Sequence, residues 1–292
     1  MRCELDGLAA RLAAERQATI DWKLLAQGRR AARGRNIQAM IDAEGLASWR
    51  PALGLSGAAL ESVLTDASFR DGVRAELATP TIFRLFNNEW DKVHVVEAVG
   101  AENRAFEQRT IADIAAAAGR DPLDTMLGLA LADGLGTVFT AQLLNSDEEA
   151  VGRMLNDANS IVSLSDAGAH LTFFNDAGFG LHLLGHWSRD RGAMSLAEAV
   201  RRLTSHPANV FGFEGRGLIR PGAAADLLLC DPRTVGRGPK RRVHDLPGGA
   251  PRLTTDALGV LGVWVKGRQV ADASGFLADT PLAGELLTRF AS

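Results

Sequence analysis

The sequence predicts an α/β protein with a parallel sheet, followed by a small β module. Strand patterns alternate with helical patterns before Phe213, which is typical of βαβ units. Residues 161–165 are mostly apolar and lead into Asp166, and α/β folds place their chemistry at the C-terminal ends of parallel strands. After Phe213, closely spaced glycines and Pro221 bound short strands, as in a separate β module.

The composition excludes several classes of protein. The chain has 292 residues, of which 46% are hydrophobic and 23% charged, as in an ordered globular protein. Its net charge of -3 gives no basic surface for nucleic acid or an anionic membrane. No long apolar run exists, and acidic residues stand near the N-terminus, so we expect a cytoplasmic location. Cys3 and Cys230 do not form a disulfide framework or a CxxC metal motif.

Amphipathic patterns dominate the first 80 residues. They predict helices over 4–33 and, in two pieces, over 57–79, with Thr65 or Asp66 as the cap of the second piece. Residues 36–41 have the composition of a strand. We expect the first helices to cover the sheet.

Strands and capped helices alternate in the middle of the chain. In order, these elements are a valine-rich strand over 90–97, a helix over 111–118 capped by Thr110, a helix from Asp121-Pro122 through Leu131, a strand over 137–140, a helix over 147–157 and the strand over 161–165. We expect the strands at 36–41, 137–140 and 161–165 to be parallel neighbours with helices on their outer side.

The last helices precede the β module. The remaining predicted elements are a helix over 182–189, a helix from the Ser195/Glu198 capping box to about Thr204, a break at His206-Pro207, and strands over 225–230 and 262–270 joined by a connection rich in proline and glycine. We expect residues 214–275 to form an antiparallel layer.

Five segments resemble the N-acyl-D-amino-acid deacylase branch of the amidohydrolase superfamily. A Gly-x-Ile-x-Pro-Gly-x-x-Ala-Asp-Leu pattern indicates the superfamily, and an Asp-Ala-Gly-Ala-His loop followed by Leu-Gly-His-Trp indicates the branch. The segments are residues 50–55, 63–70, 165–170, 184–187 and 216–232. The resemblance extends over most of the chain.

The resemblance implies a TIM-type (β/α)8 barrel flanked by a β-sandwich, of which this chain carries the C-terminal part. Residues 1–213 then belong to an incomplete barrel, and residues 214–292 form a segment of the sandwich. Asp166 falls on the family's aspartate after the eighth strand, which lies beside the metal and acts as a general base.

Amide hydrolysis explains why such a residue is needed. A divalent metal, with zinc expected, lowers the pKa of a bound water from 15.7 to about 7, and a nearby carboxylate takes its proton. The resemblance therefore implies Asp166 as the catalytic residue, with Ser165, Gly168 and His170 lining the substrate. From the stretch alone, an Asx turn in which Asp166 binds its own backbone is the favoured alternative.

The chain departs from the family in its metal ligands. The family carries a His-x-His pair and further histidines, whereas this chain has no histidine before His94 and no His-x-His. A (β/α)8 barrel alone takes about 250 residues. We therefore expect a truncated enzyme, or a subunit of a split enzyme, that is inactive alone. Its uncovered face would form a homo-oligomer or bind an N-terminal partner chain.

The other histidines have structural interpretations. His182 and His186 are four residues apart, as a zinc pair on one helix face would be, but no third ligand is near in sequence, so packing is favoured. We expect His94 to be partly buried, His206 to lie at a helix end where a cation is favourable, and His244 to be exposed.

Three functions remain open. The first is metal-dependent hydrolysis of a non-peptide C–N bond in a small N-acyl (D-)amino acid. The second is a cyclic amidase or deaminase on the same scaffold, because one fold supports many reactions. The third is a non-catalytic remnant or a subunit of a split enzyme.

Overall fold

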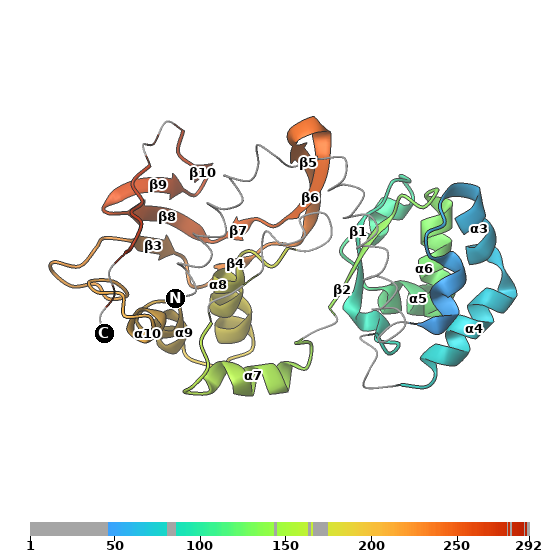
Figure 1. The fold of residues 1–292 in the computed structure, drawn as a ribbon, viewed down its shortest axis with the longest axis horizontal. Helices are drawn as coiled ribbons and strands as arrows, with labels where there is room; N and C mark the ends of the chain where they lie inside the picture. The colour runs from blue at the N-terminus through green and yellow to red at the C-terminus, as the bar shows by residue number, and fades with distance from the viewer. Residues whose placement is uncertain are drawn as a thin grey trace, which may run out of the picture. The chain divides into compact units, whose positions relative to one another are not determined.

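The structure is a computed structural model that describes residues 46–80, 86–142, 145–162, 165, 175–278, 280, 282–288 and 290. The chain divides into two compact units, whose elements are drawn in Figure 1. The first takes Met1–Trp90 and Leu123–Leu131, and the second takes Asp91–Pro122 and Ala132–Ser292. The elements predicted before residue 42 lie outside the described residues, and the division at residue 213 stays a prediction.

The described part of the first unit is helical. A 3-10 helix over Ala47–Ala52 precedes α3 (Gly57–Thr65) and α4 (Ala67–Leu77), and most of α6 (Pro122–Ala132) belongs to the same unit. The carboxylate of Asp66 accepts a hydrogen bond from the Phe69 amide at 2.8 Å and so caps α4, as the sequence predicts.

The two faces of α4 have different partners. Phe69, Val73 and Leu77 recur every four residues and are all buried. Arg70 and Arg74 bind the carboxylate of Asp124 on α6 at 2.9 and 2.7 Å. One aspartate therefore attaches two successive turns of α4 to α6.

The first strands of the second unit are antiparallel, which corrects one expectation. After a 3-10 helix over Trp90–Lys92, β1 (Val93–Glu97) pairs with β2 (Val138–Ala141), with Val93 opposite Ala141 and Glu97 opposite Val138. The connection contains two α-helices, so the chain reaches β2 at the end where β1 finished. A single crossover helix would have favoured the parallel pairing that the alternation of strands and helices predicts. The expectation that residues 137–140 run parallel to 36–41 and 161–165 stays a prediction, because 36–41 and part of 161–165 lie outside the described residues.

Two helices of the second unit begin at the predicted caps Thr110 and Ser195, and a third is capped by Asp147, the first residue of its predicted range. The side chains of Thr110, Asp147 and Ser195 accept hydrogen bonds from backbone amides three residues later, at 3.0, 2.9 and 3.2 Å. The helices are α5 (Ile111–Ala118), α7 (Glu148–Asn156), α8 (Phe179–His182) with a π-helix over Leu183–Asp190 directly after it, α9 (Leu196–Leu203) and α10 (Ser205–Val210), besides a 3-10 helix over Asn103–Phe106.

The predicted break at His206-Pro207 is wrong. The break falls at Thr204, whose φ of -129° and ψ of -89° separate α9 from α10. Pro207 is the third residue of α10, where a missing amide leaves no intrahelical hydrogen bond unmade. The helix thus tolerates the proline.

The strands after Phe213 are antiparallel, as expected. A four-stranded sheet has the order β10 (Gly275–Phe276), β9 (Arg268–Asp272), β8 (Val260–Val265) and β3 (Leu227–Cys230). The single strand predicted over 262–270 is instead the β8–β9 hairpin. Its turn residues Lys266 and Gly267 have φ values of 50° and 76°, and positive values at both positions match the twist of a two-residue hairpin.

The connection between β3 and β8 contains further strands. β4 (Gly236–Arg237) pairs with β7 (Ala257–Leu258), and β5 (Arg241–Leu246) pairs with β6 (Ala250–Thr254) around a 3-10 turn over Pro247–Gly249. A complete β-sandwich stays a prediction.

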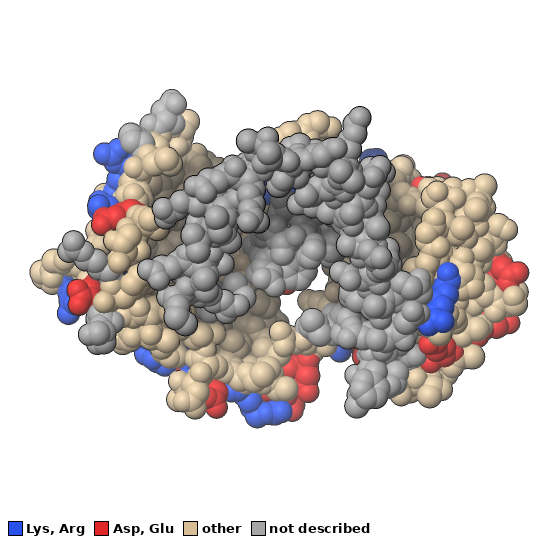
Figure 2. Space-filling model, viewed as in Figure 1, with Lys and Arg blue, Asp and Glu red and all other residues tan. Residues whose placement is uncertain are grey.

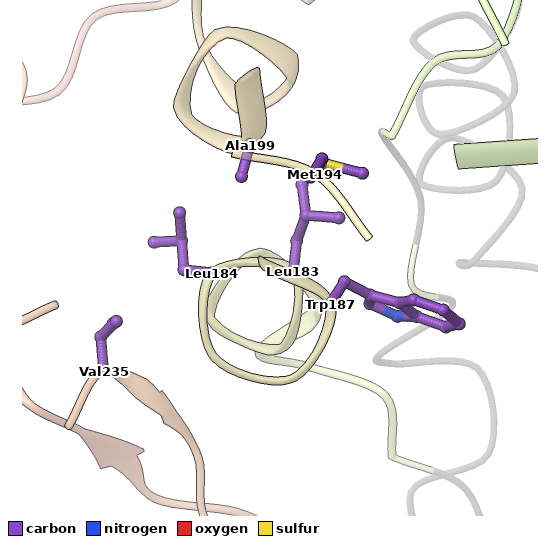
Figure 3. Close-up of a cluster of buried hydrophobic side chains, with 6 residues drawn as sticks. All are labelled: Leu183, Leu184, Trp187, Met194, Ala199 and Val235. Carbon is purple, nitrogen blue, oxygen red and sulfur yellow. The ribbon is translucent and has the colours of Figure 1, made fainter. Parts of the chain in front are cut away.

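A hydrophobic cluster joins the helices of the second unit to the start of β4. Figure 3 shows its six buried members. They are Leu183, Leu184, Trp187, Met194, Ala199 and Val235. The π-helix contributes the first three and therefore lies at the centre of this cluster.

The surface carries charges of both signs. On the face shown in Figure 2, acidic and basic side chains are intermixed and neither sign forms one large patch. Several arginines bind carboxylates directly, such as Arg252 with Asp245 at 2.7 Å. Among the described residues, no helix combines the length and the apolarity that crossing a membrane requires.

The carboxylate of Asp133 organises the turn after β1. It accepts hydrogen bonds from the amides of Val99 and Gly100 and from the side chains of Asn103 and Thr137, at 2.7 to 3.1 Å. Burial raises the pKa of Asp133, but these four hydrogen bonds outweigh it and hold the pKa below its usual value.

We expect Asp133→Asn to lower the free energy of unfolding by about 1–2 kcal/mol, because an amide cannot accept all four bonds. The stabilisation by Asp133 is present above the pKa of an unfolded aspartate, about 3.9, and is lost as the pH falls through the lower folded value. Urea unfolding at pH 7 and pH 3 measures both effects. The exposed Asp91→Asn is the control, and an equal effect of the two variants would contradict the prediction.

Gly185 allows the π-helix to touch the backbone before β4. A Cβ atom there would lie 2.6 Å from the Val235 carbonyl oxygen and 3.0 Å from the Gly236 Cα. At Gly180 in α8, the nearest atoms would be methyl groups of Leu203 at 3.7 Å, an ordinary contact.

We expect Gly185→Ala to destabilise the second unit by about 1–3 kcal/mol, because a clash with backbone exceeds the gain in helix propensity of about 1 kcal/mol. The matched Gly180→Ala should keep that gain and stabilise slightly. Urea midpoints of the two variants provide the comparison. A stabilised Gly185→Ala would show that this close packing is not required.

Candidate functional site

The structure describes one of the four predicted site residues. Ser165 is described and is half-buried, whereas Asp166, Gly168 and His170 lie outside the described residues. No strand is present at Ile161, Val162 or Ser165, and the rest of the strand predicted over 161–165 is also outside them. The structure therefore defines how the chain is held before and after residues 166–174.

A buried arginine holds the chain before Asp166. Arg202 on α9 is 2% exposed. Its guanidinium donates to the carbonyl oxygens of Asn156 at 2.9 Å and Asp157 at 3.0 Å, and more weakly to the Ser160 hydroxyl at 3.3 Å. The carbonyls belong to the C-terminal end of α7, where a helix leaves acceptors without partners and favours a cation.

Glu198 balances the charge of this arginine. Its carboxylate accepts a hydrogen bond from Arg202 at 2.8 Å and two from the more exposed Arg201 at 2.7 and 2.8 Å. Hydrogen bonds from Arg201 and then Arg202 outweigh desolvation and lower the pKa of Glu198 to about 2. Glu198 therefore stays ionised at neutral pH. Of the predicted capping box, the hydrogen bond from the Glu198 amide to the Ser195 hydroxyl is formed at 3.2 Å.

A buried amide holds the chain after the loop. Asn175 is 7% exposed and donates to the Leu253 carbonyl oxygen on β6 at 2.9 Å. Its own side-chain oxygen accepts from the Ala177 amide at 2.9 Å. The next residue, Asp176, lies 3.4 Å from Arg237 and 3.2 Å from Lys240. Polar side chains thus hold residues 156–160 and residues 175–177 within the second unit.

His182 and His186 form a packed pair, in agreement with the favoured interpretation. Their rings are stacked with centroids 4.7 Å apart, and Trp187 lies edge-on to the His186 ring at 5.2 Å. His186 Nε2 lies 2.7 Å from a Glu148 carboxylate oxygen. In the part of the chain that the structure describes, no three His, Cys, Asp or Glu side chains are grouped to hold a metal.

The remaining histidines give mixed outcomes. His94 is half-buried in β1, and His244 is exposed in β5, both as expected. His206 is the second residue of α10, near its N-terminus, so the expected favourable interaction with the end of a helix dipole is wrong.

Sequence reasoning missed Arg202 and Asn175. Arg202 follows Arg201 in an amphipathic helix and has the pattern of a solvated charge. Its one local signal is Glu198 four residues earlier, which favours an ion pair but not burial. Asn175 binds a residue 78 positions away, and no local pattern predicts such a contact.

The chain is a mixed α/β protein with an antiparallel β module, and its residues 67–271 match the amidohydrolase family. Because this match extends over more than half of the chain, the chain belongs to the amidohydrolase family. The resemblance found in the sequence is confirmed.

Individual relatives match over shorter regions. An uncharacterized protein of Mycobacterium tuberculosis is 30% identical over 179 residues, which cover 58% of this chain and 28% of that protein. A D-aminoacylase of Alcaligenes xylosoxydans xylosoxydans is 34% identical over 110 residues, 38% of this chain and 20% of that enzyme. The chain is also similar to N-acyl-D-glutamate deacylase from Bordetella bronchiseptica, whose crystal structure contains zinc and a phosphonate inhibitor. The two sequences are 30% identical, and the match covers 67% of this chain and 36% of that chain, with a TM-score of 0.35.

The chain spans a minor part of these relatives. Its matched region amounts to 28% of the mycobacterial protein and 20% of the D-aminoacylase. The match therefore establishes the family of this chain and not the activity of a complete enzyme.

We expect Arg202→Met to lower the free energy of unfolding by about 3–5 kcal/mol, because Glu198 and the carbonyls at the end of α7 lose a buried partner. The neighbouring Arg201→Met removes an exposed partner of the same carboxylate and should cost much less, because solvent screens an exposed ion pair. Urea unfolding, with hydrogen exchange of residues 156–162, measures both variants. Similar losses in the two variants would show that the burial of Arg202 is not what matters.

Proposed function

We propose that this chain supplies the general base of a hydrolase that cleaves the non-peptide C–N bond of an N-acyl (D-)amino acid. The observation that carries the proposal is the match of residues 67–271, which include Asp166, to the amidohydrolase family. Arg202 holds residues 156–160 and Asn175 is held by β6, so the nearest described anchors lie on both sides of Asp166 in sequence. A catalytic carboxylate must be held at a defined position, and anchors of this kind serve that purpose. Membership of the amidohydrolase family and similarity to a D-aminoacylase support the same reaction class.

The proton transfer assigned to Asp166 is simple. As the oxygen of water bonds to the acyl carbon, the carboxylate accepts the proton that the water loses. When the C–N bond breaks, the proton passes to the leaving nitrogen, so that a carboxylic acid and an amino acid are formed. Ser165, Gly168 and His170 would line the acyl and amino-acid groups. An Asx turn at Asp166 is the competing interpretation.

The family implies a divalent metal, with zinc expected. The described residues do not provide a set of ligands for it. They contain no group of three ligands, and the imidazole of His186 is already in contact with Glu148. We therefore propose that a metal centre would take its ligands from elsewhere, in cis or from a partner chain, and that the described part binds no metal alone. On this proposal, residues 1–213 are part of a TIM-type barrel and residues 214–292 part of its sandwich.

The test joins this chain to the N-terminal part of the Alcaligenes D-aminoacylase, in cis or by co-expression. We expect metal content and hydrolysis of N-acyl-D-amino acids in the combined protein, and no turnover by this chain alone with any added metal. Asp166→Asn should lower kcat of the combined protein by about 10²- to 10⁴-fold, because the amide cannot accept a proton.

Two measurements make the outcome decisive. Metal content should stay near that of the unsubstituted protein in Asp166→Asn, and the exposed His244→Ala should leave kcat unchanged. If Asp166→Asn retains nearly full kcat, Asp166 forms only a turn and the assignment of the general base is wrong. Hydrolysis of a cyclic amide in place of the N-acyl amino acid would favour the cyclic amidase alternative.

A further inference from the structure

An open groove of about 400 Å³ lies between α7 and the chain that runs from the π-helix to Ala193. One wall is a single face of α7, which carries Glu149, Gly152, Arg153 and Asn156. A groove of this volume accommodates a small molecule. It is therefore a candidate ligand site, in a region to which the proposed reaction gives no role.

Polar contacts join the two walls at both ends of the groove. At the first residue of α7, one carboxylate oxygen of Glu148 lies 2.7 Å from His186 Nε2 and the other lies 3.2 Å from Arg191 Nε. At the last residue of α7, the side-chain amide of Asn156 donates to the Ala193 carbonyl oxygen at 3.0 Å. The walls are thus in place before a ligand arrives, which lowers the cost of ordering them on binding.

The floor of the groove is apolar. The Trp187 side chain lines it and is 8% exposed. A Cβ atom at Gly152 would lie 3.6 Å from the indole Cζ3, which is an ordinary contact, so a larger side chain there would cover the ring. The absence of a side chain at Gly152 therefore leaves room beside the indole.

Charges of both signs border the groove. Within the described part of the chain, neither Glu149 nor Arg153 forms an ion pair. Arg191 contacts Glu148 through Nε, which is one of the five donors of its guanidinium group. Figure 2 shows acidic and basic side chains next to each other over α7, whose position is given in Figure 1. A carboxylate and two guanidinium groups thus surround a small apolar surface.

We propose that this groove binds a small zwitterion of the α-amino acid class. Arg153 and Arg191 bind its carboxylate, Glu149 binds its ammonium group, and its apolar side chain packs on Trp187. A site with charges of both signs favours a ligand that carries both, because a simple anion or cation leaves one of them without a partner. The site is a property of this chain's own fold and does not rest on the proposed reaction.

Titration of the whole chain with free leucine tests the site, with the Trp187 indole resonance and the amide resonances of residues 148–156 followed by NMR. We expect these resonances to shift with a Kd in the millimolar range, as for a small ligand in an open groove. N-acetylleucine lacks the ammonium group and leucinamide lacks the carboxylate, so each should bind here at least about tenfold more weakly. Equal binding of either analogue would overturn the proposal, and so would unshifted resonances with leucine.

A variant that fills the groove locates the ligand. Gly152→Leu should cover the indole and weaken leucine binding at least about tenfold, while it raises the helix propensity of α7. The matched control is Gly128→Leu, because Gly128 is an exposed glycine inside α6 with open space at its Cβ position. The control should bind leucine as the unsubstituted chain does. Leucine binding that Gly152→Leu leaves unchanged would show that the ligand lies elsewhere.

Charge variants cover the case in which Gly152→Leu does not fold. Glu149→Gln and Arg153→Gln change exposed side chains of α7, and each should weaken leucine binding at least about threefold. Glu149→Gln should reduce the preference for leucine over N-acetylleucine, and Arg153→Gln the preference over leucinamide, which damage to the fold would not do selectively. Arg233→Gln is the control, because its side chain is 86% exposed outside the groove. Unaltered preferences in both α7 variants would contradict the assignment.

Discussion

The buried guanidinium of Arg202 is the constraint on which the helical part of the second unit depends. A cation that is 2% exposed is tolerated only when its hydrogen bonds are made, so α7 must end where its last carbonyls reach the guanidinium. Glu198 must lie one turn earlier on the same helix to supply the negative charge. One side chain thus determines how α9 packs against the end of α7, and the hydrophobic cluster around Leu183 fills the adjoining space.

Several local signals in the sequence are reproduced by the structure. The predicted caps at Thr110 and Ser195 depend on atoms three residues apart, and both helices begin there. The break predicted at His206-Pro207 is a local signal that failed, because a proline is tolerated in the first turn of a helix. The antiparallel pairing of β1 with β2 depends on how the intervening chain returns, which no local pattern predicts. The turn of the β8–β9 hairpin was missed for a local reason, because Lys266 is not a residue type that predicts a turn.

The candidate site divides along the same line. The sequence predicts a role for Asp166 from a carboxylate that follows an apolar run and from the family resemblance, and this stays a prediction because Asp166 lies outside the described residues. Arg202 and Asn175 were not predicted, since they bind chain segments far away in sequence.

The segments that carry the family resemblance have a physical role of their own. Gly217 has a φ of 80°, and a Cβ atom there would lie 2.8 Å from both the Ser205 Cα and the Thr204 carbonyl oxygen. Gly185 meets the backbone before β4 in the same way. Both glycines allow two backbone segments to pack closely. They therefore have a role in packing and give no evidence of proton transfer or metal binding. The chain belongs to the amidohydrolase family, whereas the proposed chemistry would need Asp166 and metal ligands that the described residues do not provide.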